Sequence, residues 1–337
     1  MPLAQHLVSM SFLVSILATH LASAGEAPTN SGARAVERAL TFLEKDAKEW
    51  RKERSCATCH HGTMTVWAMS EAKAQGFAVS EPSLKEITAW TKDARLKDLD
   101  KPRDPRPGFK MINTNALYLA VMAQNLPRQD AISPEDLKQI TGHLLRHQED
   151  VGSWAWSLAP PANRMPPVFE SDEAATALGL SVLGPAAETK DQESVEGRRK
   201  AEAWLAKEPR TDTTQSLAFR LLLAVRTKQP EATVRGESER LLARQHEDGG
   251  WSQLRGLRSD AYATGQALYV LNLAGLKRDR PEIRRGVGYL VGSQRADGSW
   301  PMISRAQPGQ KPASLPVPIV HFGSAWATIG LARSVER

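Results

Sequence analysis

Residues 245–273 read QHEDGGWSQLRGLRSDAYATGQALYVLNL, and this stretch contains both units that repeat along the chain. Its first seven residues run from Gln to Trp through Asp and Gly, and related runs occupy residues 148–154 and 294–300. Gly permits the left-handed backbone that ends a helix, and a Gln amide can bond to the backbone groups freed there. These runs therefore predict structural turns. The alternative is a sugar-stacking surface made by the Trp side chains.

The second half of the stretch predicts a helix with almost no polar face. Ser259 and Asp260 are residue types that cap helix N-termini, and the run that follows them is rich in Ala, Leu, Gly and Val. Such a helix is buried on most of its sides. The same pattern recurs at 112–117, 171–178 and 323–331, and more loosely at 63–74 and 213–225.

An amphipathic segment with charges along one side precedes each of these apolar segments. The six amphipathic segments are 35–45, 84–93, 135–147, 198–207, 234–246 and 283–294. We expect them to be outer helices that face solvent and cover the apolar inner helices. Because no hairpin can bury its inner helix alone, the alternation predicts an all-α fold, a closed ring of about six helix hairpins. An open solenoid is the alternative architecture.

The first residues have the composition of an export signal. Residues 7–21 form a mainly apolar run that His20 interrupts, and Ala22-Ser23-Ala24 follows, a small-residue pattern that signal peptidase accepts. We interpret residues 1–24 as a signal peptide. The segment lacks Lys and Arg, so an uncleaved anchor is the alternative. We expect residues 25–337 to form a single periplasmic or secreted domain with no further transmembrane segment.

The overall composition is that of a globular protein. Hydrophobic residues make up 41% of the 337 residues and charged residues 24%, which argues against disorder and against an integral membrane bundle. The net charge is +6, but the basic residues are interspersed with acidic ones along the expected helices. This pattern is typical of a solvated surface, so we expect no nucleic-acid partner.

The combination of Gln-to-Trp turns with Ala-rich helices resembles a known family. It is similar to the QW repeats of squalene-hopene cyclases and of protein prenyltransferase β subunits, and the resemblance covers about residues 35–337. It implies an α/α toroid. It is much less specific for chemistry, because a toroid of this shape also serves as a non-catalytic module.

The resemblance to cyclases implies an acid at the start of an inner helix. In the cyclases an Asp-x-Asp-Asp-Thr-Ala motif supplies the proton that begins polyene cyclisation, and the corresponding stretch here contains Glu170, Asp172 and Glu173. Clustered carboxylates can hold a proton, so these three are the candidate catalytic residues of a terpenoid cyclase. The competing interpretation is that Asp172 caps a helix, as Asp260 does. Aromatic residues are only 6% of the chain and we expect most Trp in turns, which argues against an aromatic cavity for a cation.

The resemblance to prenyltransferases implies a zinc site. In that family Asp and Cys of an Asp-x-Cys pair and a His at the last inner helix hold the metal. Asp260 and His321 match the Asp and the His, but Tyr262 stands at the Cys position. A zinc site here would need a different third ligand.

Cys56-Ala57-Thr58-Cys59-His60 is the sharpest chemical motif, and its two Cys are the only ones in the chain. The spacing suits thioether bonds from Cys56 and Cys59 to haem and places His60 as the axial ligand of the iron. A redox-active disulfide, a structural disulfide and a Cys2His2 zinc site that recruits His143 and His147 are the alternatives.

The same motif ahead of a toroid is similar to a group of exported bacterial proteins that combine a c-type haem signature with cyclase-like repeats. This resemblance implies one covalent haem c and no particular substrate. We expect electron transfer or haem-assisted oxidation of a ligand held in the ring, with a redox partner or a small apolar ligand as partner. A terpenoid cyclase and a haem-free binding module are the alternatives. Met64 is too near His60 to be the sixth iron ligand, for which the candidates are Met69, Met111, Met165, Met302 and His321.

Overall fold

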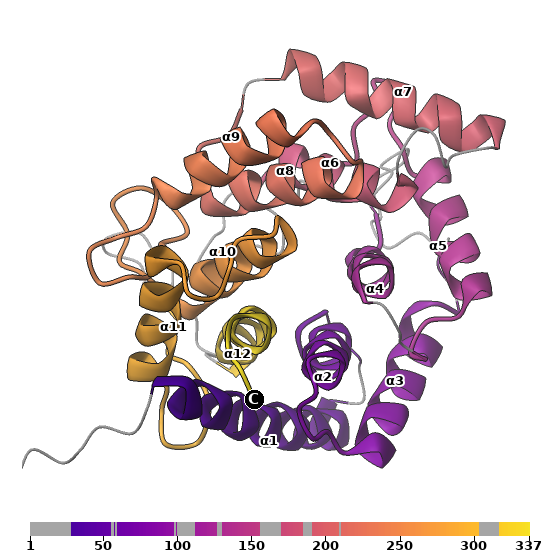
Figure 1. The fold of residues 1–337 in the computed structure, drawn as a ribbon. Helices are drawn as coiled ribbons and strands as arrows, with labels where there is room; N and C mark the ends of the chain where they lie inside the picture. The colour runs from indigo at the N-terminus through magenta and orange to yellow at the C-terminus, as the bar shows by residue number, and fades with distance from the viewer. Residues whose placement is uncertain are drawn as a thin grey trace, which may run out of the picture.

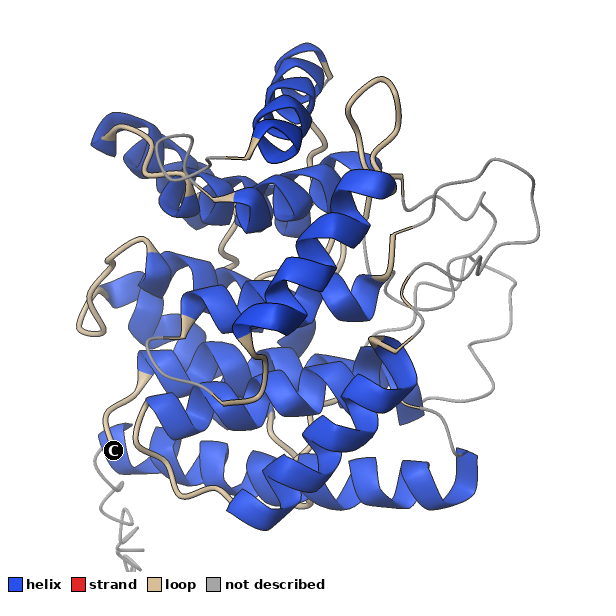
Figure 2. Ribbon diagram, turned by 90° about the vertical axis from the view of Figure 1, so that its right-hand side faces the viewer, coloured by secondary structure: helices blue, strands red, loops and turns tan. Residues whose placement is uncertain are grey.

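A computed structural model gives the fold. It describes residues 28–54, 57, 59–97, 99, 112–126, 130–155, 170–184, 191–208, 210–302 and 317–337. The expected signal peptide at residues 1–24 lies outside this part of the chain. The described residues form twelve α-helices and one π-helix and contain no extended strand (Figure 2). None of these helices is both long enough and apolar enough to cross a bilayer.

Six helices form the outer layer of the molecule. They are α1 (Pro28–Arg54), α3 (Glu81–Arg95), α5 (Pro134–Arg146), α7 (Gln192–Lys207), α9 (Glu231–Leu242) and α11 (Pro281–Ser293). Each contains most of an amphipathic segment expected from the sequence, and each has a buried stripe, such as Leu84, Ile87 and Thr91 in α3. The expected bounds were wrong for α1, which extends well beyond residues 35–45 at both ends.

The inner layer contains the other six α-helices. They are α2 (Thr65–Ala74), α4 (Thr114–Asn125), α6 (Asp172–Leu183), α8 (Thr214–Arg226), α10 (Ala261–Leu273) and α12 (Val317–Ser334), and the π-helix η1 (Cys59–Met64) leads directly into α2. Small residues let these helices approach closely. A Cβ atom added to Gly265 in α10 would lie 2.2 Å from the carbonyl oxygen of Trp326 in α12.

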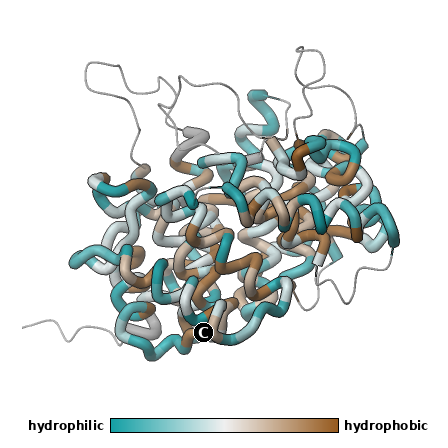
Figure 3. The backbone as a smooth tube through the Cα atoms, turned by 90° about the horizontal axis from the view of Figure 1, so that it is seen from above, coloured by the Kyte–Doolittle hydropathy of each residue, from teal (hydrophilic) through white to brown (hydrophobic). Residues whose placement is uncertain are grey.

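The two layers close into a ring, the α/α toroid expected from the sequence. Viewed end-on, α12 lies between α10 and α2, and the first outer helix α1 runs beside the last, α11 (Figure 1). Hydrophobic stretches gather on the helices inside the ring, and hydrophilic ones on its outside (Figure 3). Closure removes the open solenoid as an alternative, because first and last hairpins bury each other.

The Gln-to-Trp turns connect neighbouring outer helices, as their residue types suggested. The side chain of Gln148 donates to the carbonyl oxygen of Gly152 in its own turn at 2.9 Å and to that of Gly197 in α7 at 2.8 Å. Gln245 makes the same pair of bonds, to Gly249 and to Glu282 in α11, both at 2.8 Å. Each of these Gln amides thus caps the end of one outer helix and links it to the next outer helix by a hydrogen bond.

The three Trp residues of these turns are fully buried. Trp154, Trp251 and Trp300 have 0% exposure, and each indole nitrogen donates to a carbonyl oxygen of the preceding outer helix at 2.7–2.8 Å. Each Trp backbone nitrogen donates at 2.9 Å to a Thr or Ser hydroxyl of the following inner helix. The alternative of a sugar-stacking surface is therefore wrong, because no indole face meets solvent.

Candidate functional site

The starts of the inner helices gather at one end of the ring. Side chains from successive helix starts bond to one another there: Thr63 of η1 donates to Asn115 of α4 at 2.8 Å, and Gln215 of α8 donates to Tyr262 of α10 at 2.7 Å. Most of the polar residues expected at these starts are caps. Asn113, Ser171, Thr213 and Asp260 each accept a backbone hydrogen bond from the first turn of their helix.

A cluster at this end contains groups of another kind: the side chains of Asp46 in α1, His61 in η1 and His321 in α12. The Oδ2 atom of Asp46 lies 2.8 Å from Nε2 of His61 and 2.7 Å from Nδ1 of His321. Both imidazoles have 0% exposure and the carboxylate 20%. The three ligand-type atoms lie within 4.8 Å of one another. We call these residues the Asp46 cluster.

Neighbouring side chains hold both imidazoles of the cluster in place. The Nε2 atom of His321 lies 2.8 Å from the hydroxyl of Thr65. The Nδ1 atom of His61 is in hydrogen-bond contact with Nδ1 of His60. The indole of Trp50 stacks on His61 with an interplanar angle of 8° and a centroid distance of 4.3 Å, and it meets His60 edge-on. These contacts fix the orientations of the His61 and His321 rings.

Burial determines the charge of these groups. It lowers the pKa of His60 and of His61 to about 3, and it lowers the pKa of His321 despite the nearby carboxylate. Burial acts in the opposite direction on Asp46, but hydrogen bonds from His321 and His61 outweigh it and hold the pKa of this carboxyl well below its ordinary value. The site therefore combines neutral imidazoles with a carboxylate.

The Asp46 cluster corrects the ligand grouping that the prenyltransferase resemblance implied. Asp260 does not accompany His321: its Oδ1 accepts from the backbone of Ala263 at 2.8 Å, and its Oδ2 accepts from Gln253. Sequence reasoning missed Asp46 and His61. A signal for Asp46 existed, because it continues the buried stripe of α1 and is a carboxylate at an apolar position.

The haem motif leads into the same region of the ring. Cys56 and Thr58 lie outside the described residues, as does the side chain of Cys59. His60 is half-buried in η1, and the side chain of Arg95 donates to the carbonyl oxygen of Ala57, between the two Cys positions. A π-helix is rare and often occurs at functional sites.

Most candidate partners for the haem motif belong to elements other than η1. His143 is on α5 and His147 is the C-cap of that helix, and Nε2 of His143 accepts from the backbone of Asn113 at 3.0 Å. Met64 and Met69 are buried in the core. Met302 contacts Gly323 at the start of α12, and Met111 and Met165 lie outside the described residues. His321 is the one sixth-ligand candidate that belongs to the Asp46 cluster.

The three cyclase-type carboxylates lie at the start of α6. Ser171 is the cap of this helix, so the idea that Asp172 is the cap was wrong; Asp172 is the first helical residue and half-buried. Glu173 is 4% exposed and accepts from Nε of Arg220 at 2.6 Å and from the backbone of Thr211, also at 2.6 Å. These bonds link Glu173 to α8 and to the segment before it, and Asp172 lies beside Glu173 at the first position of α6.

The axis of the ring is more aromatic than the composition suggested. Five aromatic residues from the inner helices, each less than 2% exposed, pack there with centroid distances of 5.0–6.4 Å: Trp67, Tyr118, Phe219, Tyr269 and Trp326. The expectation that most Trp would lie in turns was wrong, because five of the nine Trp residues lie in helices, and Trp67 and Trp326 among them are central. Within the described residues these rings fill the axis.

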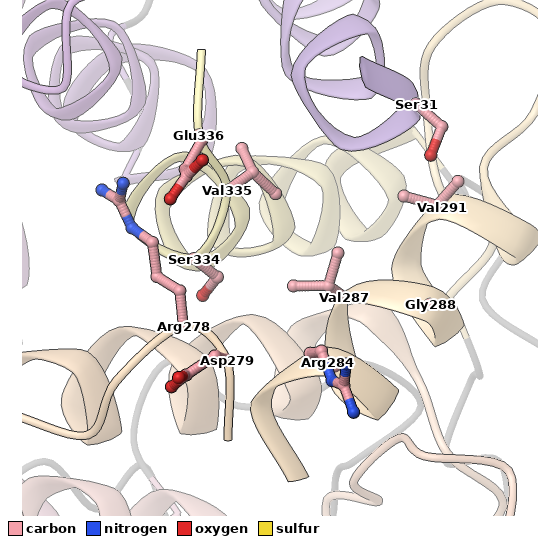
Figure 4. Close-up of a pocket in the computed structure, with 10 residues that line it drawn as sticks. All are labelled: Ser31, Arg278, Asp279, Arg284, Val287, Gly288, Val291, Ser334, Val335 and Glu336. Carbon is pink, nitrogen blue, oxygen red and sulfur yellow. The ribbon is translucent and has the colours of Figure 1, made fainter. Parts of the chain in front are cut away.

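A small apolar cavity lies elsewhere in the ring. It has a volume of about 310 Å³, and the side chains of Val287, Val291 and Val335 face it between α11, α12 and the start of α1 (Figure 4). Ser334 at the end of α12 also lines it, about 20 Å along the helix from His321. No candidate site residue lines this cavity.

Known structures resemble this ring in shape. A type II terpene cyclase from Scytonema, solved with geranylgeranyl dihydroxybenzoate, matches with a TM-score of 0.56 and 15% identity over 91% of this chain and 98% of its own. A polysaccharide lyase matches with a TM-score of 0.55 and 12% identity over 90% and 97%. An α-1,6-mannanase from Salegentibacter matches with a TM-score of 0.53 and 11% identity over 90% and 98%. Identities this low show a shared α/α toroid fold alone. Neither a protein-family model nor a curated protein sequence matches the chain.

Proposed function

We propose that this protein is an exported c-type haem protein, in which the toroid carries one covalent haem at Cys56, Cys59 and His60. It acts in electron transfer or in haem-assisted oxidation of a small apolar ligand. The observation that carries the proposal is the orientation of His60: Nδ1 contacts a second imidazole, His61, and the ring edge packs on Trp50. A His that ligates a metal through one nitrogen normally hydrogen-bonds through the other.

The residues of this chain have separate roles in the proposal. Cys56 and Cys59 would hold the haem through thioether bonds, and His60 would bind the iron through Nε2, because its Nδ1 is in contact with His61. The side chain of Arg95 donates a hydrogen bond to the carbonyl oxygen of Ala57 and so holds the backbone between the two Cys positions. The bound haem supplies one-electron redox chemistry.

The position of the motif in the ring also supports the proposal. The outer helices α5, α9 and α11 are each followed by a Gln-to-Trp turn, whereas α1, α3 and α7 are not. Among these three, α1 is followed by the Cys-x-x-Cys-His run, which leads directly into the inner layer through η1. The charged surface supports a protein or small-molecule partner over nucleic acid, since basic side chains such as Arg51 and Arg199 pair with acidic ones.

Production with and without a cytochrome c maturation system tests the proposal. We expect a Soret band that survives acid-acetone extraction in the wild type and is lost from the Cys56→Ser/Cys59→Ser variant. His60→Gln should keep the thioether bonds and change the spin state of the iron. Replacement of His147, on a different helix, is the matched control and should leave the spectrum unchanged. A colourless wild type with a Cys56–Cys59 disulfide contradicts the proposal.

Acid-initiated cyclisation is the second candidate function. Two observations favour it: the cluster of aromatic rings from the inner helices, side chains whose faces attract cations, and the half-buried Asp172 at the start of α6. Conversion of squalene or shorter polyprenoids is the measurement. In this function Asp172→Asn abolishes turnover and leaves haem content and thermal stability nearly unchanged. Glu173→Gln is the comparison, because it weakens the ion pair with Arg220 and lowers stability instead. A wild type that converts no polyprenoid excludes the cyclase.

A further inference from the structure

We propose that Asp46, His61 and His321 bind a divalent transition-metal ion, for which Zn²⁺ is the reference. The proposal does not depend on haem, because none of its three ligands belongs to the Cys-x-x-Cys-His run. It also differs from the prenyltransferase pattern, because it uses neither Asp260 nor Tyr262. The three ligands come from the first outer helix, from η1 and from the last inner helix, and only ring closure brings them together.

The first argument is the donor set and its spacing. Two imidazoles and one carboxylate are ligands that Zn²⁺ and related ions prefer, and three protein ligands leave a fourth position for water or substrate. Both ring nitrogens point at one oxygen of Asp46, at 2.8 and 2.7 Å. The three ligand-type atoms lie within 4.8 Å of one another, and ligand atoms around tetrahedral Zn²⁺ are about 3.3 Å apart, so side-chain shifts of about 1 Å would bring them to that spacing.

The second argument is the contact between the two imidazoles. The rings of His61 and His321 have centroids 3.9 Å apart and an interplanar angle of 33°, and both side chains are fully buried. The two rings come from η1 and α12 and meet beside one carboxylate, as two imidazole ligands of a single metal ion do.

The third argument is the support behind the ligands. Metal-binding imidazoles almost always hydrogen-bond through their second nitrogen, which fixes ring orientation and ligand basicity. Both imidazoles have such a contact, His321 with Thr65 and His61 with His60. The contact between the two His residues serves one ion at a time: His61 is its donor when His61 binds Zn²⁺, and His60 is its donor when His60 binds iron. The carboxylate is the one ligand with measurable exposure, 20% of its side chain, and this leaves a path for the ion.

Metal binding to the full chain tests the proposal. Wild-type protein freed of metal by chelation should take up one equivalent of Zn²⁺, and the ion should raise the melting temperature. Asp46→Asn should weaken binding beyond the roughly 10- to 100-fold loss typical of a lost outer partner, and Thr65→Val should weaken it within that range. His246→Gln is the matched control, because His246 is a half-buried His that bonds to Ser252 and Ser259 and lies outside the cluster.

Co²⁺ substitution in the wild-type sequence needs no variant to fold, and both metal experiments use protein made without a cytochrome c maturation system, so that haem absorption does not mask the Co²⁺ bands. Nitrogen and oxygen ligands should give visible d–d bands without the near-ultraviolet charge-transfer band of a thiolate ligand. Cys56→Ser/Cys59→Ser removes haem attachment and should leave the Co²⁺ spectrum unchanged, so failure of the haem proposal and failure of this one are distinguishable. The proposal is overturned by a wild type that takes up no Zn²⁺, or by binding that survives Asp46→Asn and is lost with the two Cys. In the first case the cluster is only a hydrogen-bonded link between α1, η1 and α12.

Discussion

Gln294 donates a hydrogen bond from its side-chain nitrogen to the carbonyl oxygen of Ala35, 259 positions earlier in the chain, at 2.8 Å. The same nitrogen donates to Gly298 at 3.0 Å, and Arg38 donates back to the Gln294 oxygen. Gln148 and Gln245 make equivalent bonds to the outer helix that follows them. For Gln294 the next outer helix is α1, so the repeated turn closes the ring.

Replacement of Gln294 should weaken the contact between α11 and α1. Gln294→Ala leaves two carbonyl oxygens without their donor, and we expect a loss of about 1 to 3 kcal/mol in the free energy of unfolding. Hydrogen exchange should rise in α1 more than elsewhere. Gln245→Ala is the control, since it breaks the same bonds between α9 and α11 and should leave exchange in α1 nearly unchanged. Equal exchange in α1 for both variants would contradict the closing role.

The glycine of each Gln-to-Trp turn should be irreplaceable. Gly298 has a φ angle of +88°, and an added Cβ would lie 2.3 Å from the carbonyl oxygen of Arg38. We expect Gly298→Ala to cost at least the roughly 1 to 3 kcal/mol of a strained backbone. Gly292→Ala, in exposed helical backbone with nothing within 4 Å of the added atom, should instead stabilise by about 0.5 to 1 kcal/mol. Chemical denaturation of both variants measures the difference in sign.

Each Trp of a Gln-to-Trp turn should contribute a large part of the free energy of unfolding. Trp251 has 0% exposure and donates to Leu241 at 2.8 Å, and truncation of such a side chain typically costs about 3 to 5 kcal/mol. Trp251→Ala should therefore lower the melting temperature strongly. Trp90→Ala, which removes a half-buried Trp of α3, should have a smaller effect. A similar decrease in melting temperature for both variants would mean that burial of Trp251 in the turn does not determine its contribution to stability.

Asp297, in the turn that ends at Trp300, predicts a pH dependence of the free energy of unfolding. The hydroxyl and the backbone nitrogen of Ser299 donate to Asp297 and hold its pKa below its ordinary value of 3.8. A lowered pKa in the folded state contributes stability above the unfolded-state pKa and loses it as the pH falls through the folded-state value. The difference in unfolding free energy between wild type and Asp297→Asn should therefore shrink as the pH falls below about 5. A difference that stays constant over this range would contradict the assignment.

The sequence by itself determined the architecture, because the information is local and repeated. Apolar spacing marks each helix face, and a Gln, a Gly and a Trp in one turn specify how a helix ends and what the indole meets. Caps such as Asp260 and Thr213 could be read in the same way. Where two adjacent residues could both serve, as Ser171 and Asp172 could, only the backbone geometry decided that Ser171 is the cap.

The tertiary structure alone decided which distant groups meet. Asp46 lies 15 positions from His61 and 275 from His321, and no local pattern couples positions so far apart. The aromatic cluster on the axis has the same origin, since Trp67 and Trp326 meet only when the last inner helix packs beside the first. Helix periodicity tells which face of a segment is buried, but the neighbour of that face depends on how the whole ring closes.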